Sequence, residues 1–132
     1  MLDEFIFWSA VNVVCITAGY ILSPKCFVVR PGTIHERAVW LASILIHPLM
    51  VYYAVDHTLQ ARHTIGTRWM SINPSSQSFL LLSLSYMIAS TVGFVNMKKS
   101  QRIIMGIHHA ISSTAFLIVL ATGRMHFFST LA

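Results

Sequence analysis

The chain has 132 residues, of which 55% are hydrophobic and only 10% are charged. Soluble domains carry about a quarter charged residues, so this composition excludes an ordinary soluble domain and predicts an all-α, polytopic integral membrane protein. The formal charge of +5 comes from nine Lys and Arg residues against four Asp and Glu residues. Because the basic residues are scattered over connecting segments without forming a stripe, we expect no nucleic-acid partner.

Four apolar segments are each long enough to cross a bilayer as a helix, which takes about 20 residues. They are residues 5–22, 39–59, 79–97 and 103–122. No internal repeat or soluble segment of domain size lies between them. We therefore expect a single membrane domain over residues 1–132, with about four transmembrane helices.

The first two segments carry local signals. Asn12 is a polar residue inside the first apolar helix, and we expect it to hydrogen-bond to a neighbouring helix rather than to bind a ligand. Thr33 and Glu36 have the spacing of a capping box, which predicts that the second helix begins there. Pro48 follows His47 within that helix, and a proline inside a helix removes a backbone hydrogen bond, so we expect a kink beside His47.

The far end of the second segment carries a band of aromatic and charged residues, namely Tyr52, Tyr53, Asp56 and His57. Such bands are typical of the membrane–water interface. The simpler interpretation of this band is that it anchors the helix at the membrane surface. The alternative is that it forms a polar entrance to a cavity.

The distribution of basic residues predicts the orientation in the membrane. Lys25, Arg30, Arg37, Lys98, Lys99 and Arg102 fall on the side of the first and third connections, and Arg62, Arg68 and Arg124 on the other side. By the positive-inside rule, the six-charge side faces the cytoplasm, matrix or stroma, and both termini face the opposite compartment. We expect the interfacial residues Tyr52, Tyr53, Asp56, Lys98, Lys99 and Arg102 to contact phospholipids.

Three histidines, His47, His108 and His109, lie inside predicted helices away from the interfacial band of His57, and an ionisable residue there is a functional-site hypothesis by default. Counting the helical rise from the basic side places His47 about 13 Å deep and His108 and His109 about 10 Å deep. Tyr86 lies about 16 Å deep on the same scale. The three imidazoles could therefore share one layer of the bundle, with Tyr86 at its border.

Such a layer has three uses. Neutral histidines hydrogen-bonded to serines would tie helices together, and Ser85, Ser112 and Ser113 are the expected partners. One histidine could act as a general base towards a lipid hydroxyl or amine. His47 and His108 could instead hold haem b across the bundle. No carboxylate lies at this depth, which argues against a di-iron site, and we expect no metal ion.

An ordered set of residues between about positions 35 and 123 carries a resemblance to a known family. The set comprises Trp40 and His47, then Ser85-Tyr86, then a basic turn from Lys98 to Arg102, and finally His108-His109. It resembles the TLC family of polytopic membrane proteins, in part and divergently. In the ceramide synthases of that family the histidine pair is associated with acyl transfer to a sphingoid base, which implies catalytic roles for His108, His109 and His47 if this chain is an enzyme.

The departures from the TLC pattern change what the resemblance implies. The position expected to be acidic after the tyrosine motif is not acidic, the paired downstream aspartates are absent, and the sequence ends after the fourth segment. We therefore expect a non-catalytic relative, not an acyltransferase. A second similarity, of Arg30-Pro31 and of Gly106 to His109, is to the haem-binding membrane anchors of succinate dehydrogenase. It keeps a haem-binding anchor subunit as an alternative.

A four-span chain with almost no extramembrane mass is typical of subunits at the periphery of larger assemblies. We expect a non-catalytic accessory subunit, without a cofactor of its own, that contacts other membrane protein subunits and phospholipids. The mitochondrial respiratory chain or ATP synthase is the first expectation for that assembly, and the mitochondrial inner membrane for the location. The alternative is a TLC-type lipid-handling protein of the endoplasmic reticulum.

Overall fold

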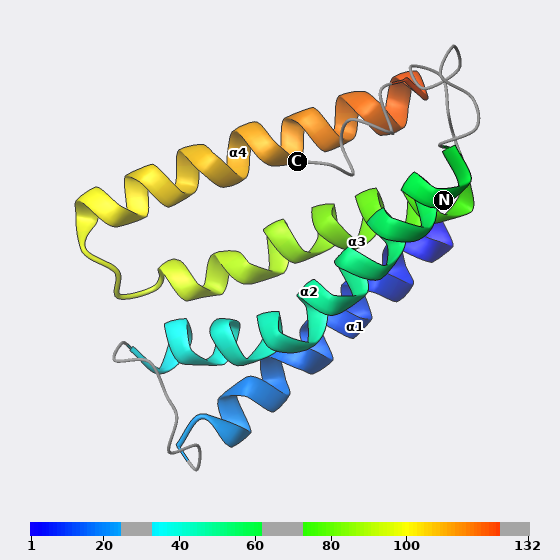
Figure 1. Ribbon diagram of the computed structural model, residues 1–132. Coiled ribbons are helices and arrows are strands. Elements are labelled where there is room, and N and C mark those ends of the chain that lie inside the picture. Colours follow the sequence, from blue (N-terminus) through cyan, green and yellow to red (C-terminus); the bar gives the residue numbers. More distant parts are fainter. Residues whose placement is uncertain (25–32, 62–72, 125–132) are drawn as a thin grey trace.

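The computed structural model describes residues 1–24, 33–61 and 73–124. They form α1 (Leu2–Leu22), α2 (Ile34–Ala61), α3 (Pro74–Ala89), the short 3₁₀ helix η2 (Ser90–Phe94) that continues α3, and α4 (Lys99–Thr122). Successive long helices run in opposite directions (Figure 1). Four helical segments, with η2 counted as part of the third, are long and apolar enough to cross a membrane. The described residues contain no strand, so the chain is an all-α integral membrane protein.

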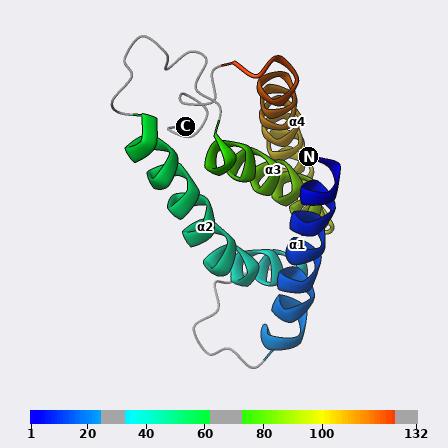
Figure 2. The ribbon, with the colours of Figure 1, turned by 90° about the vertical axis from the view of Figure 1, so that its right-hand side faces the viewer.

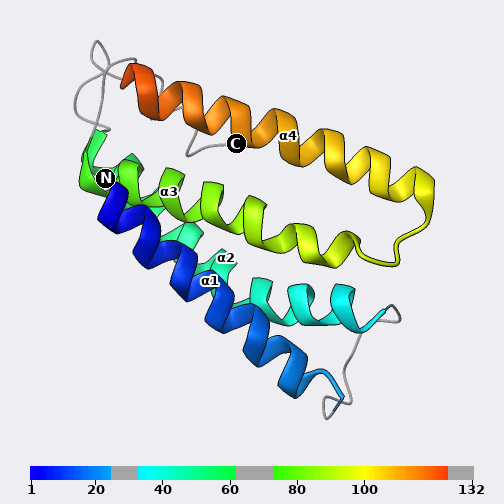
Figure 3. The same cartoon turned by 180° about the vertical axis from the view of Figure 1, so that it is seen from behind.

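Helix α3 lies at the centre of this arrangement. It packs against α1, α2 and α4, whereas α4 makes its main contacts with α3 and η2 alone. Figures 2 and 3 show α1 beside α2 and α3, with α4 beyond α3. Half of the α3 span is buried inside the protein, against 6% of the α4 span. The first three helices therefore form a packed unit, and α4 rests on one side of it.

Asn12 and Gly19 make two of the contacts that hold α1 in the packed unit. Asn12 is fully buried and donates hydrogen bonds from Nδ2 to the Trp8 carbonyl at 2.9 Å and to Ser85 Oγ of α3 at 2.7 Å. This confirms the predicted bond between helices. Nearer the other end, the backbone of α1 at Gly19 approaches α2 so closely that a Cβ there would lie 2.3 Å from the Ala38 carbonyl oxygen.

Local signals explain how α2 begins and bends. The Thr33 amide donates to Glu36 Oε2 at 2.7 Å and the Glu36 amide to Thr33 Oγ1 at 3.2 Å, which is the predicted capping box. Pro48 lies inside the helix, and the ribbon changes direction near its middle (Figure 1). Proline cannot donate a backbone hydrogen bond and its ring crowds the preceding turn, so the bend has a local cause.

The third helix begins earlier than the predicted segment 79–97. Asn73 accepts a hydrogen bond from the Ser76 amide at 2.8 Å, and Pro74 occupies the first helical position, where a missing N–H is harmless. The α-helix ends at Ala89 and continues as 3₁₀ helix to Phe94. Asn96 then adopts a φ of 82°, a left-handed conformation that asparagine tolerates, and the chain turns into α4.

The basic residues of the first and third connections lie at one end of the bundle where the structure describes them. Arg37 lies in the first turns of α2, and Lys98, Lys99 and Arg102 lie at the exposed start of α4. Lys25, Arg30, Arg62 and Arg68 are outside the described residues. The end that carries Arg37 and Lys98 is the one predicted to face the cytoplasm, matrix or stroma.

Candidate functional site

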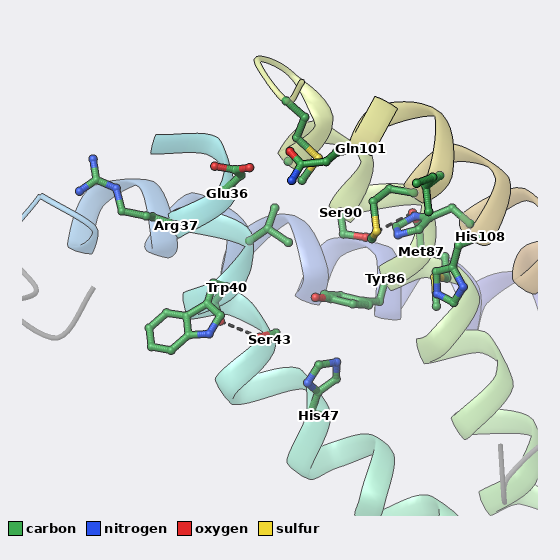
Figure 4. Close-up of a pocket in the computed structure, with 16 residues that line it drawn as sticks. Glu36, Arg37, Trp40, Ser43, His47, Tyr86, Met87, Ser90, Gln101 and His108 are labelled. Carbon is green, nitrogen blue, oxygen red and sulfur yellow. Dashed lines mark hydrogen bonds between the residues drawn. The ribbon is translucent and has the colours of Figure 1, made fainter. Parts of the chain in front are cut away.

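A pocket of about 680 Å³ opens between α2 and α4, above the end of α3. Its walls combine imidazole, hydroxyl and amide groups with aliphatic and thioether side chains (Figure 4). The lining residues are Glu36, Arg37, Val39, Trp40, Ser43, His47, Tyr86, Met87, Ser90, Gly93, Met97, Gln101, Ile104, Met105, His108 and His109. The pocket therefore draws on α2, on α3 with η2, and on α4.

All three histidines predicted to share a layer line this pocket, together with Tyr86. The ring of His47 meets the ring of Tyr86 edge to face, with centroids 5.6 Å apart. In Figure 4 the Tyr86 side chain points toward α2, above His47, and His108 approaches from α4. His47 and His108 are both exposed side chains, and neither makes a hydrogen bond to another described residue. Their polar atoms face the pocket or its surroundings.

His109 is held differently from the other two histidines. Its Nδ1 lies 2.8 Å from the carbonyl oxygen of Met87, and its ring meets Phe94 edge to face at 4.7 Å. A carbonyl oxygen can only accept, so Nδ1 carries the proton and donates it. In the neutral ring Nε2 is therefore an acceptor, and Nε2 makes no hydrogen bond within the described residues.

The change of helix type in the third span explains why this carbonyl is available. Met87 belongs to the last turn of α3, whose carbonyls have no regular partner within the α-helix. The Ser90 hydroxyl donates to the same oxygen at the long distance of 3.4 Å. The end of α3 thus supplies the acceptor that fixes the ring of His109.

The hydrogen bonds expected between the histidines and serines are not the ones that the structure shows for Ser85 and His109. Ser85 accepts from Asn12 and donates to the Leu82 carbonyl at 2.9 Å. The hydrogen bond of His109 goes to a backbone carbonyl instead. The rings of His108 and His109 lie 5.7 Å apart at a steep angle, as adjacent positions 100° apart on a helix require.

Both charged residues of the lining belong to the start of α2. Glu36 already accepts the hydrogen bond of the Thr33 amide in the capping box. Figure 4 shows the guanidinium of Arg37 extending away from His47 and Tyr86. The part of the pocket around the histidines is consequently polar without a fixed charge.

The aromatic and charged band of α2 is separate from this pocket. His57 is fully buried, and its Nδ1 lies 2.9 Å from Asn73 Oδ1. Asp56 accepts hydrogen bonds from Gln60, at 2.8 Å, and from Ser75. Tyr53 packs edge to face on Trp8, with centroids 5.7 Å apart, and on Tyr52 at 5.2 Å. The band therefore joins α2 to α1 and α3, and none of its residues lines the pocket of the histidines.

Sequence reasoning missed several contributors to the site. Ser43, Ser90 and Gln101 line the pocket, and the Met87 carbonyl orients His109. The cluster Ser90, Thr91 and Gly93 carried a signal of the change in helix type, since small and hydroxyl residues disturb a regular α-helix.

A metal site was not expected, and no group of three or more His, Cys, Asp or Glu side chains suited to a metal ion occurs in the part of the chain that the structure describes. Haem binding by His47 and His108 stays a prediction.

The chain matches no protein-family model, no curated protein and no solved structure.

Proposed function

We propose that this chain is a lipid-binding membrane protein of TLC type, whose ligand lies in the pocket between α2 and α4. One observation supports the proposal above all. Of the positions that carry the TLC resemblance, Trp40, His47, Tyr86, His108 and His109 line the same pocket from three helices, whereas Ser85, Lys98, Lys99 and Arg102 lie outside its lining.

Polar side chains without a partner are costly inside a membrane. An imidazole that faces hydrocarbon without a partner is unfavourable, so such residues usually face a cavity or a ligand. His47 and His108 are exposed and have no hydrogen bond within the described residues. Val39, Ile104 and Met105 provide an apolar wall in the same pocket. A lipid offers a polar group to the histidines and a hydrocarbon chain to this apolar wall.

Binding without catalysis is the activity that we propose. Acyl transfer by a histidine base is helped by a carboxylate that orients the ring and stabilises its charge. Glu36 is the one carboxylate of the described lining, and it is engaged at the start of α2. His109 is oriented by a backbone carbonyl, which holds the ring without adding a negative charge.

An accessory subunit of a larger membrane assembly is the second candidate, and the feature that favours it is α4. Only 6% of its span is buried inside the protein, so one whole side is open to lipid or to another subunit. The two candidates imply different membranes. The TLC resemblance points to the endoplasmic reticulum, and the subunit hypothesis to the mitochondrial inner membrane.

The test is the lipid that the protein retains after purification from native membranes in a mild detergent. Ser43 lines the pocket, whereas its neighbour Ile44 is 51% exposed and lies outside the lining. Ser43→Phe should fill the pocket and lower the retained lipid, counted per protein by mass spectrometry, about tenfold. Ile44→Phe adds the same ring outside the pocket and should retain lipid like the wild type.

Two outcomes would oppose the proposals. Equal lipid retention in both variants would place the lipid elsewhere and remove the pocket from its binding. The same purification tests the second candidate, because a subunit should co-migrate with a large complex. Elution as a small isolated species would exclude it.

A further inference from the structure

We infer that the ligand of this pocket is an uncharged lipid alcohol whose hydroxyl donates a hydrogen bond to His109 Nε2. The inference rests on the proposed lipid-binding function and names the class of headgroup. Hydrogen-bond chemistry and charge lead to it independently.

The hydrogen-bond chemistry follows from the fixed ring of His109. Because Nδ1 donates to the Met87 carbonyl over 2.8 Å, the remaining nitrogen of the neutral ring offers a lone pair and no proton. A ligand atom that satisfies it must be a donor. Esters, ketones and ethers accept only, so a lipid whose polar groups are all of those kinds would leave Nε2 unpaired.

The charge of the lining excludes an ionised headgroup. Among the described lining residues Glu36 and Arg37 are the charged pair, and their charges cancel. Glu36 is engaged by Thr33, and Arg37 extends away from the histidines. A carboxylate, phosphate or ammonium beside His109 would therefore lie in the membrane span without a counter-ion, which is costly.

A hydroxyl meets both conditions at once. Its proton goes to His109 Nε2, and its oxygen still accepts a hydrogen bond. The Tyr86 hydroxyl is already hydrogen-bonded to Ser43. The rings of His47 and His108 can present a donor to the oxygen of the lipid hydroxyl, since no described partner fixes their tautomers. A neutral amine could donate in the same way, but an alkylamine is protonated at neutral pH and then brings the charge that the pocket does not balance.

The test uses three photoreactive probes with one hydrocarbon chain and different headgroups. They are hexadecanol, hexadecanoic acid and hexadecylamine, each with a diazirine in the chain, applied to the purified full-length protein in detergent micelles. The alcohol should label peptides of α2 and α4 that line the pocket about tenfold more strongly than the acid or the amine. Unlabelled hexadecanol should compete for that labelling.

A variant tests the role of Nε2 directly. The amide nitrogen of an asparagine can take the place of Nδ1, so His109→Asn can keep the bond to the Met87 carbonyl but has no acceptor at the position of Nε2. It should lose most of the preference for the alcohol while its thermal unfolding stays close to that of the wild type.

The outcomes separate this inference from the proposed function. Pocket labelling by the acid or the amine at the level of the alcohol, or an undiminished preference in a folded His109→Asn protein, would overturn the headgroup assignment and leave lipid binding intact. Failure of all three probes to label the pocket would overturn both.

Discussion

The two sides of α3 use polar side chains in different ways. Towards α1 and α2, polar groups bond to one another across helices, as in Asn12 with Ser85 and His57 with Asn73. Glu4 of α1 likewise accepts from Gln77, at 2.8 Å, and from Ser78. Towards α4, the one side chain of the histidine group that is tied down is His109, and its partner is a backbone carbonyl.

This difference indicates which side holds the fold together and which side is free to bind. A hydrogen bond between helices fixes their relative position, and its removal leaves a buried group unpaired. A polar side chain on a pocket wall contributes little to the fold and remains available for a ligand. The comparison predicts that substitutions towards α1 and α2 change stability, and that substitutions towards α4 change binding.

The largest expected effect on stability is at Gly19, where the backbones of α1 and α2 approach one another closely. In Gly19→Ala the new Cβ would lie 2.3 Å from the Ala38 carbonyl oxygen, so α1 and α2 must separate. We expect a loss of about 3 kcal/mol in the free energy of unfolding. The measurement is unfolding by SDS in detergent micelles, followed by circular dichroism.

Gly106→Ala is the matched control for this prediction. A Cβ at Gly106 would meet nothing within 4 Å, and alanine favours a helix over glycine by up to about 1 kcal/mol. The same substitution should therefore leave stability unchanged or raise it on the α4 side. A loss at Gly106 as large as that at Gly19 would contradict the comparison.

The next effect is expected at Asn73, which joins α2 to the start of α3 on the packed side. Its side chain caps the Ser76 amide, accepts from His57 and donates to Gln60 Oε1 at 2.8 Å. We expect Asn73→Ala to lower the free energy of unfolding by about 2 kcal/mol, from the lost cap and the lost links to α2. The same SDS titration measures it.

Asn73→Ser separates the two contributions. Serine is a good N-cap residue but is too short to keep the bonds to His57 and Gln60. It should recover about half of the loss. Full recovery would mean that the links to α2 contribute nothing to stability.

Features with a local cause could be predicted from the sequence. The four spans follow from runs of apolar residues, the start of α2 from Thr33 and Glu36, and the bonding role of Asn12 from its isolation among apolar neighbours. Even Asn73 carried a start signal, because asparagine followed by proline suits the first positions of a helix. The predicted segment 79–97 nevertheless begins later, because it follows the apolar run that starts at Phe79.

Features that depend on packing could not be predicted. The histidines at positions 47, 57, 108 and 109 look alike in sequence, since each lies in or near an apolar helix. Whether each one is buried, hydrogen-bonded or exposed depends on where α2 and α4 lie around α3. The orientation of His109 also depends on the change of the third span to 3₁₀ helix after Ala89. A pattern of side chains gives depth along a helix but does not say which backbone carbonyl will be available.

The smallest effect on stability is expected at His108, compared with His57. His57 is fully buried and bonded to Asn73, so His57→Ala should cost about 2 kcal/mol in the free energy of unfolding. His108 is exposed on the pocket wall, and His108→Ala should change that free energy by less than about 0.5 kcal/mol. Lipid retention should respond in the opposite order, with a loss in a stably folded His108→Ala protein. Equal destabilisation by the two substitutions would mean that α4 is packed as tightly as α1 and α2, and the division between a structural side and a binding side of α3 would be wrong.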